Sequence, residues 1–242
     1  MRRFFIDPRN IHESQATLTG TDAHHLHRVL RLGPGQEVEL FDGLGMVYQA
    51  RIDTIEPGLV KLTLTAASDT PPKGLAIHLG QAMLKGKKMD LVVQKCTELG
   101  VRSLLPFTSQ HTKTPAPAAA KIDRWQRIIL ESCKQCNQPW PPTCRPPQTF
   151  SELLAAASEF DLCLICWEQP NAPPLSAMAD KVILPGSILV LIGPEGGFSG
   201  EEVEAAQKAG FLPIGLGPRI LRGETAAIAI IALLQYIFND LD

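Results

Sequence analysis

The sequence of 242 residues contains no apolar run long enough to cross a membrane. Its longest run, from Ala226 to Leu234, falls well short of the roughly 18 residues that a spanning helix needs. The N-terminus also lacks the apolar core of a signal peptide, because Met1 to Ile6 is followed at once by Asp7-Pro8. We therefore expect a soluble, cytoplasmic protein.

A strong excess of one charge is missing as well. The formal net charge is -2, so no global positive field indicates a polyanionic partner. Nucleic-acid binding is not excluded, because a local patch can provide it. The first 31 residues hold such a patch in the arginines and histidines Arg2, Arg3, Arg9, Arg28, Arg31, His12, His24, His25 and His27. Composition alone leaves open whether this patch binds a ligand or only solvates the surface.

Hydrolytic triads and metal sites have little support. No Ser-His-Asp or Cys-His arrangement is visible, and beyond the first 31 residues the only histidines are His78 and His111. Cys133-x-x-Cys136 and Cys163-x-x-Cys166 have the spacing of zinc ligands. However, Phe160 to Trp167 is typical of a buried strand, on which positions i and i+3 face opposite sides. We expect reduced, mostly buried cysteines and no metal.

The chain divides into two predicted domains, at 1–70 and 74–242. The first is mainly β, with strands at 3–6, 37–41, 46–52 and 59–66 and a short helix that Thr21-Asp22 caps and that runs to Arg31. Asp42-Gly43-Leu44-Gly45 predicts a hairpin turn, and Ser68 to Gly74 reads as a linker. The alternation of strands and helices from residue 75 onward predicts an α/β domain with a mostly parallel sheet.

The elements of the second domain are predicted from apolar periodicity and from glycines at helix ends. Strands are expected at 75–79, 103–107, 161–167, 188–192 and 211–216, and helices at 88–99, 122–136, 150–157, 201–209 and 225–238. The last helix is apolar on every side between Ala226 and Leu234. It is therefore either a central core helix or part of a subunit interface.

Two glycine-rich turns are the main candidate site. Gly193 to Phe198 follows the apolar strand 188–192, and Leu216 to Thr225 follows the next predicted strand. Neither turn has the spacing of G-x-G-x-x-G or G-x-x-x-x-G-K-[ST]. Glycines at a strand end let backbone groups approach a ligand closely, so two such turns suggest a pocket built from loops. By spacing alone, Glu195 reads more readily as a structural carboxylate than as a base, and Lys85 to Lys88 as solvated lysines.

Together these segments resemble the RsmE family of small-subunit ribosomal RNA methyltransferases, in the SPOUT superfamily of α/β-knot methyltransferases. Two of the matching segments, Leu191–Phe198 and Leu216–Ala226, are highly specific in this order and spacing. The matching segments are Arg2–Phe5, His24–Arg31, Asp42-Gly43, Lys87–Asp90, Gln94–Val101, Glu131–Cys136, Leu191–Phe198 and Leu216–Ala226.

The resemblance implies a PUA-like β-barrel that helps to bind RNA, followed by a SPOUT domain with a deep trefoil knot, an exception to the usual absence of knots. It implies S-adenosylmethionine (SAM) as cofactor, a homodimer through the C-terminal domain, and methylation of N3 of a decoding-region uridine in 16S rRNA. The implied cofactor residues are Leu191, Ile192, Gly193, Gly196, Gly197, Leu216, Gly217, Pro218, Ile220, Leu221 and Thr225. The implied RNA residues are Arg2, Arg3, Arg9, His25, Arg28, Arg31, Lys85, Lys87 and Lys88.

Uridine N3 carries a proton and attacks poorly until that proton leaves, so positioning and proton removal are the main tasks of the implied site. Glu195 or Glu224 is expected to take the proton, and Arg222 to orient the uracil or its phosphate. Two departures from the family pattern, at Asn137 and His111, fall where relatives carry arginines and suggest a rearranged basic lining. The alternatives are methylation of a different RNA and a non-catalytic RNA-binding protein.

Overall fold

The computed structural model describes residues 2–72, 74–169, 172–175 and 185–238. The chain divides into two compact units, which are described separately. The first comprises Met1–Pro72 and Cys133–Pro141, and the second comprises Lys73–Ser132 and Pro142–Asp242. No helix among the described residues is both long and apolar enough to span a bilayer.

The first unit is built on a six-stranded sheet in the order β1-β4-β5-β6-β3-β2. Its strands are β1 (Arg3–Phe5), β2 (Ile11–His12), β3 (Gln15–Thr19), β4 (Glu37–Phe41), β5 (Met46–Glu56) and β6 (Leu59–Asp69). Only β1 and β4 pair in parallel, and the other neighbours are antiparallel. The inward side chains, among them Phe4, Leu40 and Leu62, form a core of their own.

The hairpin expected around Asp42 is present and joins β4 to β5. Asp42 is nearly buried, and its Oδ1 accepts hydrogen bonds from the amides of Leu44 (2.7 Å) and Met46 (3.1 Å). The carboxylate therefore holds the turn from inside, as aspartates commonly do. The helical segment differs from expectation: α1 (Gly20–His24) begins after Thr19, which makes no side-chain cap bond, and it continues as a π-helix over His25–Val29.

A distant segment of sequence completes the first unit. Cys133–Pro141, which the sequence analysis placed in the second domain, groups with residues 1–72. Within this unit, Lys134 Nζ lies 2.6 Å from Asp22 Oδ1, and the indole nitrogen of Trp140 donates to the Thr70 carbonyl at 2.7 Å. The unit therefore needs residues from both parts of the chain.

The second unit contains a sheet in the order β10-β8-β7-β12-β11-β13, with β9 paired to β8. Its strands are β7 (Ala76–Ala82), β8 (Ser103–Thr108), β9 (Thr143–Cys144), β10 (Gln148–Thr149), β11 (Leu162–Cys166), β12 (Ser187–Ile192) and β13 (Leu212–Ile214). Every described pairing in this sheet is parallel, which confirms the predicted α/β class.

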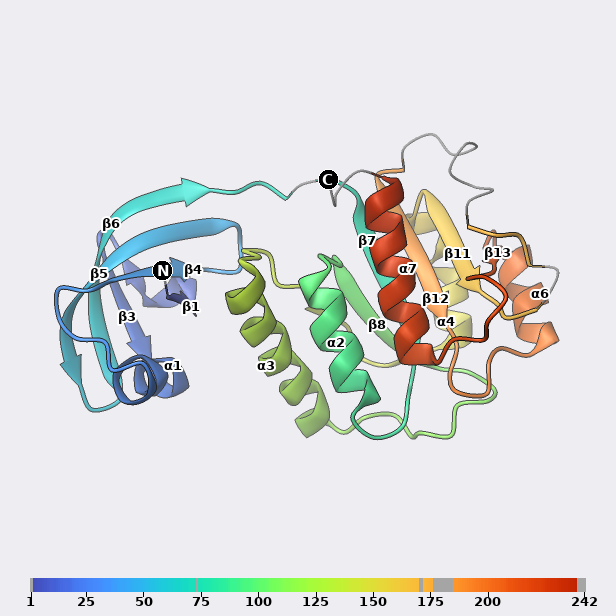
Figure 1. Ribbon diagram of the computed structural model, residues 1–242, viewed down its shortest axis with the longest axis horizontal. Coiled ribbons are helices and arrows are strands. Elements are labelled where there is room, and N and C mark those ends of the chain that lie inside the picture. The colour runs from blue at the N-terminus through green and yellow to red at the C-terminus, as the bar shows by residue number, and fades with distance from the viewer. Residues whose placement is uncertain (1, 73, 170–171, 176–184, 239–242) are drawn as a thin grey trace. The chain divides into compact units, whose positions relative to one another are not determined.

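Helices lie on both faces of this sheet. They are α2 (Lys88–Glu98), α3 (Ala119–Cys136), α4 (Phe150–Ala155), α6 (Gly200–Lys208) and α7 (Gly223–Ile237), with a 3-10 turn at Ala157–Glu159. Figure 1 shows α2 and α7 side by side on the near face, with α4 on the far face. Leu189 and Leu191 of β12 pack with α4 and α6, and α7 covers the opposite face of β12. The sheet is therefore covered on both sides, as parallel sheets are.

The last helix is covered along one face only among the described residues. Ala227, Ile230 and Ile231 are fully buried, whereas Leu233 is 42% and Tyr236 66% exposed. Leu233 and Tyr236 are large and mostly apolar, so this face of α7 has the character of a protein–protein interaction surface.

Candidate functional site

The two glycine turns follow β12 and β13, the two parallel neighbours of β11, and they meet at the carboxyl end of the sheet. A Cβ atom added at Gly223 would lie 3.3 Å from the Gly193 carbonyl oxygen and 3.0 Å from Leu84 Cδ2. At Gly193 an added Cβ would lie 3.3 Å from the backbone carbon of Gly197. The turns pack so closely that side chains at these positions would separate them.

A cavity of about 370 Å³ lies between the turns, within the range of small-molecule sites. Most of the predicted cofactor residues line it: Ile192, Gly193, Gly197, Leu216, Gly217, Pro218, Ile220 and Leu221. Leu191, Gly196 and Thr225 do not. Leu191 is fully buried beneath the turn, Gly196 packs against His111, and Thr225 is exposed on the first turn of α7.

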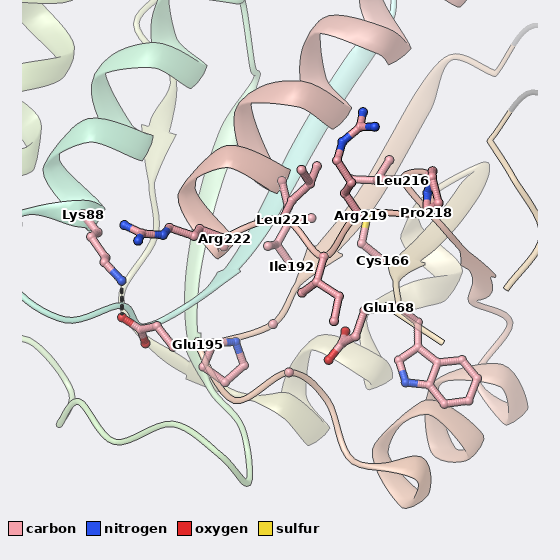
Figure 2. A pocket seen from close by; sticks show the side chains of 18 residues that line it. Lys88, Cys166, Glu168, Ile192, Glu195, Leu216, Pro218, Arg219, Leu221 and Arg222 are labelled. Atoms are coloured by element: carbon pink, nitrogen blue, oxygen red, sulfur yellow. Dashed lines mark hydrogen bonds and ion pairs between the residues drawn. The ribbon is translucent and has the colours of Figure 1, made fainter. Parts of the chain in front are cut away.

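The structure adds wall residues that the sequence analysis missed. Cys166, Trp167 and Glu168, at and just beyond the end of β11, line the cavity. Figure 2 shows Glu168 beside Ile192. The one available signal was their position at the end of a strand in a parallel sheet, where ligands commonly bind. This signal could be used only once the sheet order was known, because the pairing of β11 with β12 brings these three residues to the glycine turn.

Glu195 lines the cavity and is bound to the N-terminal end of α2. Its Oε1 accepts from the Lys85 amide and from Lys88 Nζ, both at 3.0 Å (Figure 2). Partial burial raises the pKa of Glu195, but these hydrogen bonds outweigh it and hold the pKa below its ordinary value. The carboxylate is therefore ionised at neutral pH. Both of these hydrogen bonds end on Oε1, so Oε2 can still accept a proton or a hydrogen bond.

Lys88 joins a second predicted carboxylate to this group. Glu224 Oε2 lies 3.8 Å from Lys88 Nζ and has no hydrogen-bond partner among the described residues. The Glu224 side chain is only 12% exposed and does not line the cavity, whereas Arg222 does. The structure therefore brings Glu195, Glu224 and Lys88 together. The cation in this trio, Lys88, is engaged by carboxylates rather than free for RNA.

The start of α2 is itself fixed from α3. Asp90 accepts hydrogen bonds at 3.0 Å from the Trp125 indole nitrogen and from Arg124 Nε. Trp125 is fully buried. Because α2 is anchored through Asp90 in its first turn, Lys88 has a defined position beside Glu195.

The remaining predicted RNA residues differ in accessibility. Lys85 and Lys87 in the second unit are exposed, as are Arg2, Arg28 and Arg31 in the first. Arg9 is exposed and pairs with Asp7, and His25 is half-buried against Phe4. Arg3 is different: its side chain is 6% exposed, lies 3.2 Å from Glu39 and stacks over Phe41. A buried, paired guanidinium supports the fold of the first unit, so we leave Arg3 out of the RNA contacts proposed below.

His111 is in contact with the glycine turn. Its Nδ1 lies 3.1 Å from the Gly196 carbonyl oxygen and 3.2 Å from that of Gly197. Since carbonyl oxygens only accept, Nδ1 must carry the proton and donate. The neighbouring Gln110 amide donates to Glu202 at 2.8 Å, and Glu202 forms the capping box of α6 with Ser199. The segment 109–112 therefore holds the turn from outside.

Removal of this support is expected to weaken ligand binding at the turn. We predict that His111→Ala lowers affinity for the ligand of the cavity about 3- to 10-fold, since one hydrogen bond contributes about 1 kcal/mol. Isothermal titration calorimetry measures the change, with His27→Ala, an exposed histidine of the first unit, as control. Equal affinities for His111→Ala and the unmodified protein would show that the turn keeps its shape without this contact.

None of the six cysteines forms a disulfide bond. Cys96, Cys133 and Cys163 are buried, and the other three are half-buried. Burial raises the pKa of Cys166, which lies in the cavity wall, above its ordinary value and leaves an unreactive thiol. No group of three or more His, Cys, Asp or Glu residues in the described part of the chain could hold a metal ion.

Known proteins share both the sequence and the fold. A family described as an RNA methyltransferase domain matches residues 71–235, and one described as an RNA methyltransferase PUA domain matches residues 18–65. The ribosomal RNA small subunit methyltransferase E of Synechocystis sp. is 35% identical over 98% of this chain and 78% of its own. The chain belongs to the ribosomal RNA small subunit methyltransferase E family.

Other members of the methyltransferase E family agree over nearly the whole chain. The Bacillus subtilis protein is 27% identical over 98% of this chain and 96% of its own. The Neisseria gonorrhoeae enzyme, solved bound to S-adenosylmethionine, is 32% identical, covers 100% of both chains and has a TM-score of 0.88. The family resemblance, the α/β class and the PUA-like module are thereby confirmed, and the SPOUT superfamily stays a prediction. The trefoil knot, the domain boundaries and the roles of individual site residues stay predictions.

Proposed function

We propose that this protein transfers the methyl group of SAM to N3 of a decoding-region uridine in 16S rRNA. The observation that carries the proposal is the cavity between the two glycine turns in a chain of the methyltransferase E family. A SAM-bound relative with 32% identity supports the choice of cofactor. We further propose the deep knot that the family resemblance implies, with the two turns as its loops.

The cavity has the features that SAM requires. Ile192, Leu216 and Leu221 supply apolar walls for a purine, and Gly193 and Gly197 contribute backbone without side chains to the same cavity. Charged groups of both signs line the same cavity, which suits a ligand with a carboxylate, an ammonium and a cationic sulfur. When bound, SAM supplies an electrophilic methyl group.

The protein's own contribution is to orient the uracil and remove its proton. We propose that Glu195 accepts the N3 proton through Oε2 while Oε1 stays bound to Lys85 and Lys88. Arg222, at the cavity wall, orients the uracil or its phosphate. Glu224 is the second candidate for the proton, through its Oε2, which lies 3.8 Å from Lys88 Nζ and has no hydrogen-bond partner among the described residues.

The proposed RNA contacts are the exposed basic residues of each unit. In the first unit these are Arg2, Arg9, Arg28 and Arg31 with His25 at the edge of the helix, and in the second Lys85 and Lys87. Such contacts neutralise phosphates and depend on salt rather than on base identity. Lys88 is proposed to contribute mainly through Glu195.

Two measurements test the function. Calorimetric titration with SAM should give one site per chain, and deletion of the gene should remove one N3-methyluridine from 16S rRNA. Restoration of that mark by the intact gene is the control. SAM binding with an unchanged 16S rRNA would favour a different RNA substrate, and no SAM binding would favour a non-catalytic RNA-binding protein.

We also propose a homodimer through the exposed apolar face of α7. Leu233→Glu is expected to convert the dimer to a monomer in sedimentation experiments, because a charge would be buried at the interface without a partner. Gln207→Glu, on the exposed surface of α6, is the control and should remain dimeric. A dimer that persists in Leu233→Glu would place the interface elsewhere.

A further inference from the structure

Glu168 is a second carboxylate in the wall of the cavity, and the catalytic proposal does not use it. It lies just beyond β11, after Trp167, whose amide donates to the Ile214 carbonyl at 2.9 Å. That bond ties the chain to the end of β13 and fixes the point from which the Glu168 side chain leaves. Figure 2 shows this side chain beside that of Ile192, across the cavity from Lys88 and Glu195.

The Glu168 carboxylate has no partner within the part of the chain that the structure describes. Among the described residues, none donates a hydrogen bond to it and none forms an ion pair with it, although Arg219 and Arg222 line the same cavity. Glu195, by contrast, is bound by two donors from the start of α2. Of the two carboxylates that line the cavity, Glu168 is therefore the one left free for a ligand.

The position of Glu168 depends on Gly197. Gly197 has a φ of +67°, which residues other than glycine rarely adopt. A Cβ added there would also overlap Glu168 Oε1. The carboxylate thus lies directly over the glycine turn, in the space that a side chain at position 197 would take.

The sheet order indicates which group of a ligand the Glu168 carboxylate could bind. β11 and β12 are adjacent and parallel, so a glycine turn follows one strand and a carboxylate follows its neighbour. In nucleotide-binding α/β folds an acidic residue after the neighbouring strand accepts hydrogen bonds from ribose hydroxyls. Two carboxylate oxygens can accept one bond from each hydroxyl of a vicinal diol.

We propose that Glu168 binds the ribose hydroxyls of SAM and so fixes the nucleoside in the cavity. The proposal rests on the proposed function, since it assigns a contact to the same cofactor. It distinguishes the two cavity carboxylates by role: Glu195, on the Lys88 side, serves the substrate, and Glu168, on the β11 side, serves the cofactor.

The test compares two ligands in calorimetric titrations of the full-length protein. SAM carries the amino-acid group and the ribose, whereas 5′-methylthioadenosine keeps the ribose and lacks the α-ammonium. Glu168→Ala is expected to weaken both about 10- to 100-fold, because hydrogen bonds to a charged group are lost in each case. Glu168→Gln keeps one acceptor oxygen and should lose less. Glu204→Ala, an exposed glutamate on α6, should bind both ligands like the unmodified protein.

The possible outcomes separate this inference from the proposed function. Loss of affinity for SAM alone would assign Glu168 to the α-ammonium or the sulfonium, which 5′-methylthioadenosine lacks, and overturn the ribose assignment. Unchanged affinity for both ligands would overturn any cofactor contact by Glu168 while leaving the proposed function intact. An unmodified protein that binds no SAM would overturn the proposed function itself. Thermal unfolding of Glu168→Ala should match that of Glu204→Ala, so that a loss of affinity reports the contact and not misfolding.

Discussion

Glu195→Gln is expected to slow methyl transfer by about 10²- to 10⁴-fold, the range typical of a lost general base. SAM affinity should stay within about threefold, which is about 0.6 kcal/mol, because we assign Glu195 to the substrate and not to SAM. The glutamine carbonyl can still accept from the Lys85 amide, so the turn keeps its attachment to α2. What is lost is the negative charge and the free oxygen that would receive the N3 proton.

Single-turnover methylation of the rRNA substrate with SAM in excess measures this rate without product release. Glu201→Gln, an exposed glutamate in the first turn of α6, is the matched control and should react at the unmodified rate. Turnover by Glu195→Gln equal to that of the control would remove Glu195 from the mechanism.

The same measurement on Glu224→Gln distinguishes the two proton acceptors. Glu224 does not line the cavity and lies 3.8 Å from Lys88 Nζ, so its replacement acts mainly through Lys88 and should cost less than that of Glu195. A larger loss at Glu224 than at Glu195 would reverse the assignment of the base.

The pH dependence follows from the pKa of Glu195. Because the pKa lies below the ordinary value, the carboxylate is fully charged throughout the neutral range and becomes protonated only in acid. Protonation of Glu195 therefore cannot limit the rate near pH 7. A rate that rises between pH 6 and 8 would report another group, for example the uridine N3 proton itself.

Local sequence predicted the parts of the site that each lie on one segment. The apolar run 188–192 is buried on both faces, as strands of a parallel sheet are. The glycines that follow this run indicated a ligand-binding turn. The Ser199-Gly200-Glu201-Glu202 sequence indicated the start of α6, and Ser199 and Glu202 do form a capping box there.

Parts that depend on tertiary neighbours were not predictable in this way. Glu168 follows a strand with no distinguishing motif, and only the pairing of β11 with β12 brings it to the glycine turn. The strand β2 has only two residues, too few for an alternating pattern, and in β3 only Ala16 and Leu18 are apolar. Residues 133–141 continue a helix of the second domain in sequence, yet their side-chain contacts with Asp22 and Thr70 belong to the first unit.

Gly45→Ala is expected to destabilise the first unit by about 2–5 kcal/mol. Gly45 has a φ of +102°, which costs a residue with a side chain about 1–2 kcal/mol. The added Cβ would also overlap the Trp140 ring, with Cε2 at 2.8 Å, and lie 3.1 Å from the Thr70 carbonyl oxygen. The ring cannot move aside freely, because its indole nitrogen donates to that same carbonyl. Overpacking of this kind typically costs a further 1–3 kcal/mol, roughly.

Gly58→Ala is the matched control, because Gly58 also has a positive φ, +75°, but has nothing within 4 Å of the added Cβ. It should lose only the backbone cost, about 1–2 kcal/mol. Hydrogen exchange by mass spectrometry on the full chain measures the opening of β4 and β5, and about 3 kcal/mol, within the range expected for Gly45→Ala, corresponds to at least about 100-fold faster exchange. Similar exchange in the two variants would mean that Trp140 moves without cost. The segment 133–141 would then add little to the stability of the first unit, and residues 1–72 would hold their fold largely without it.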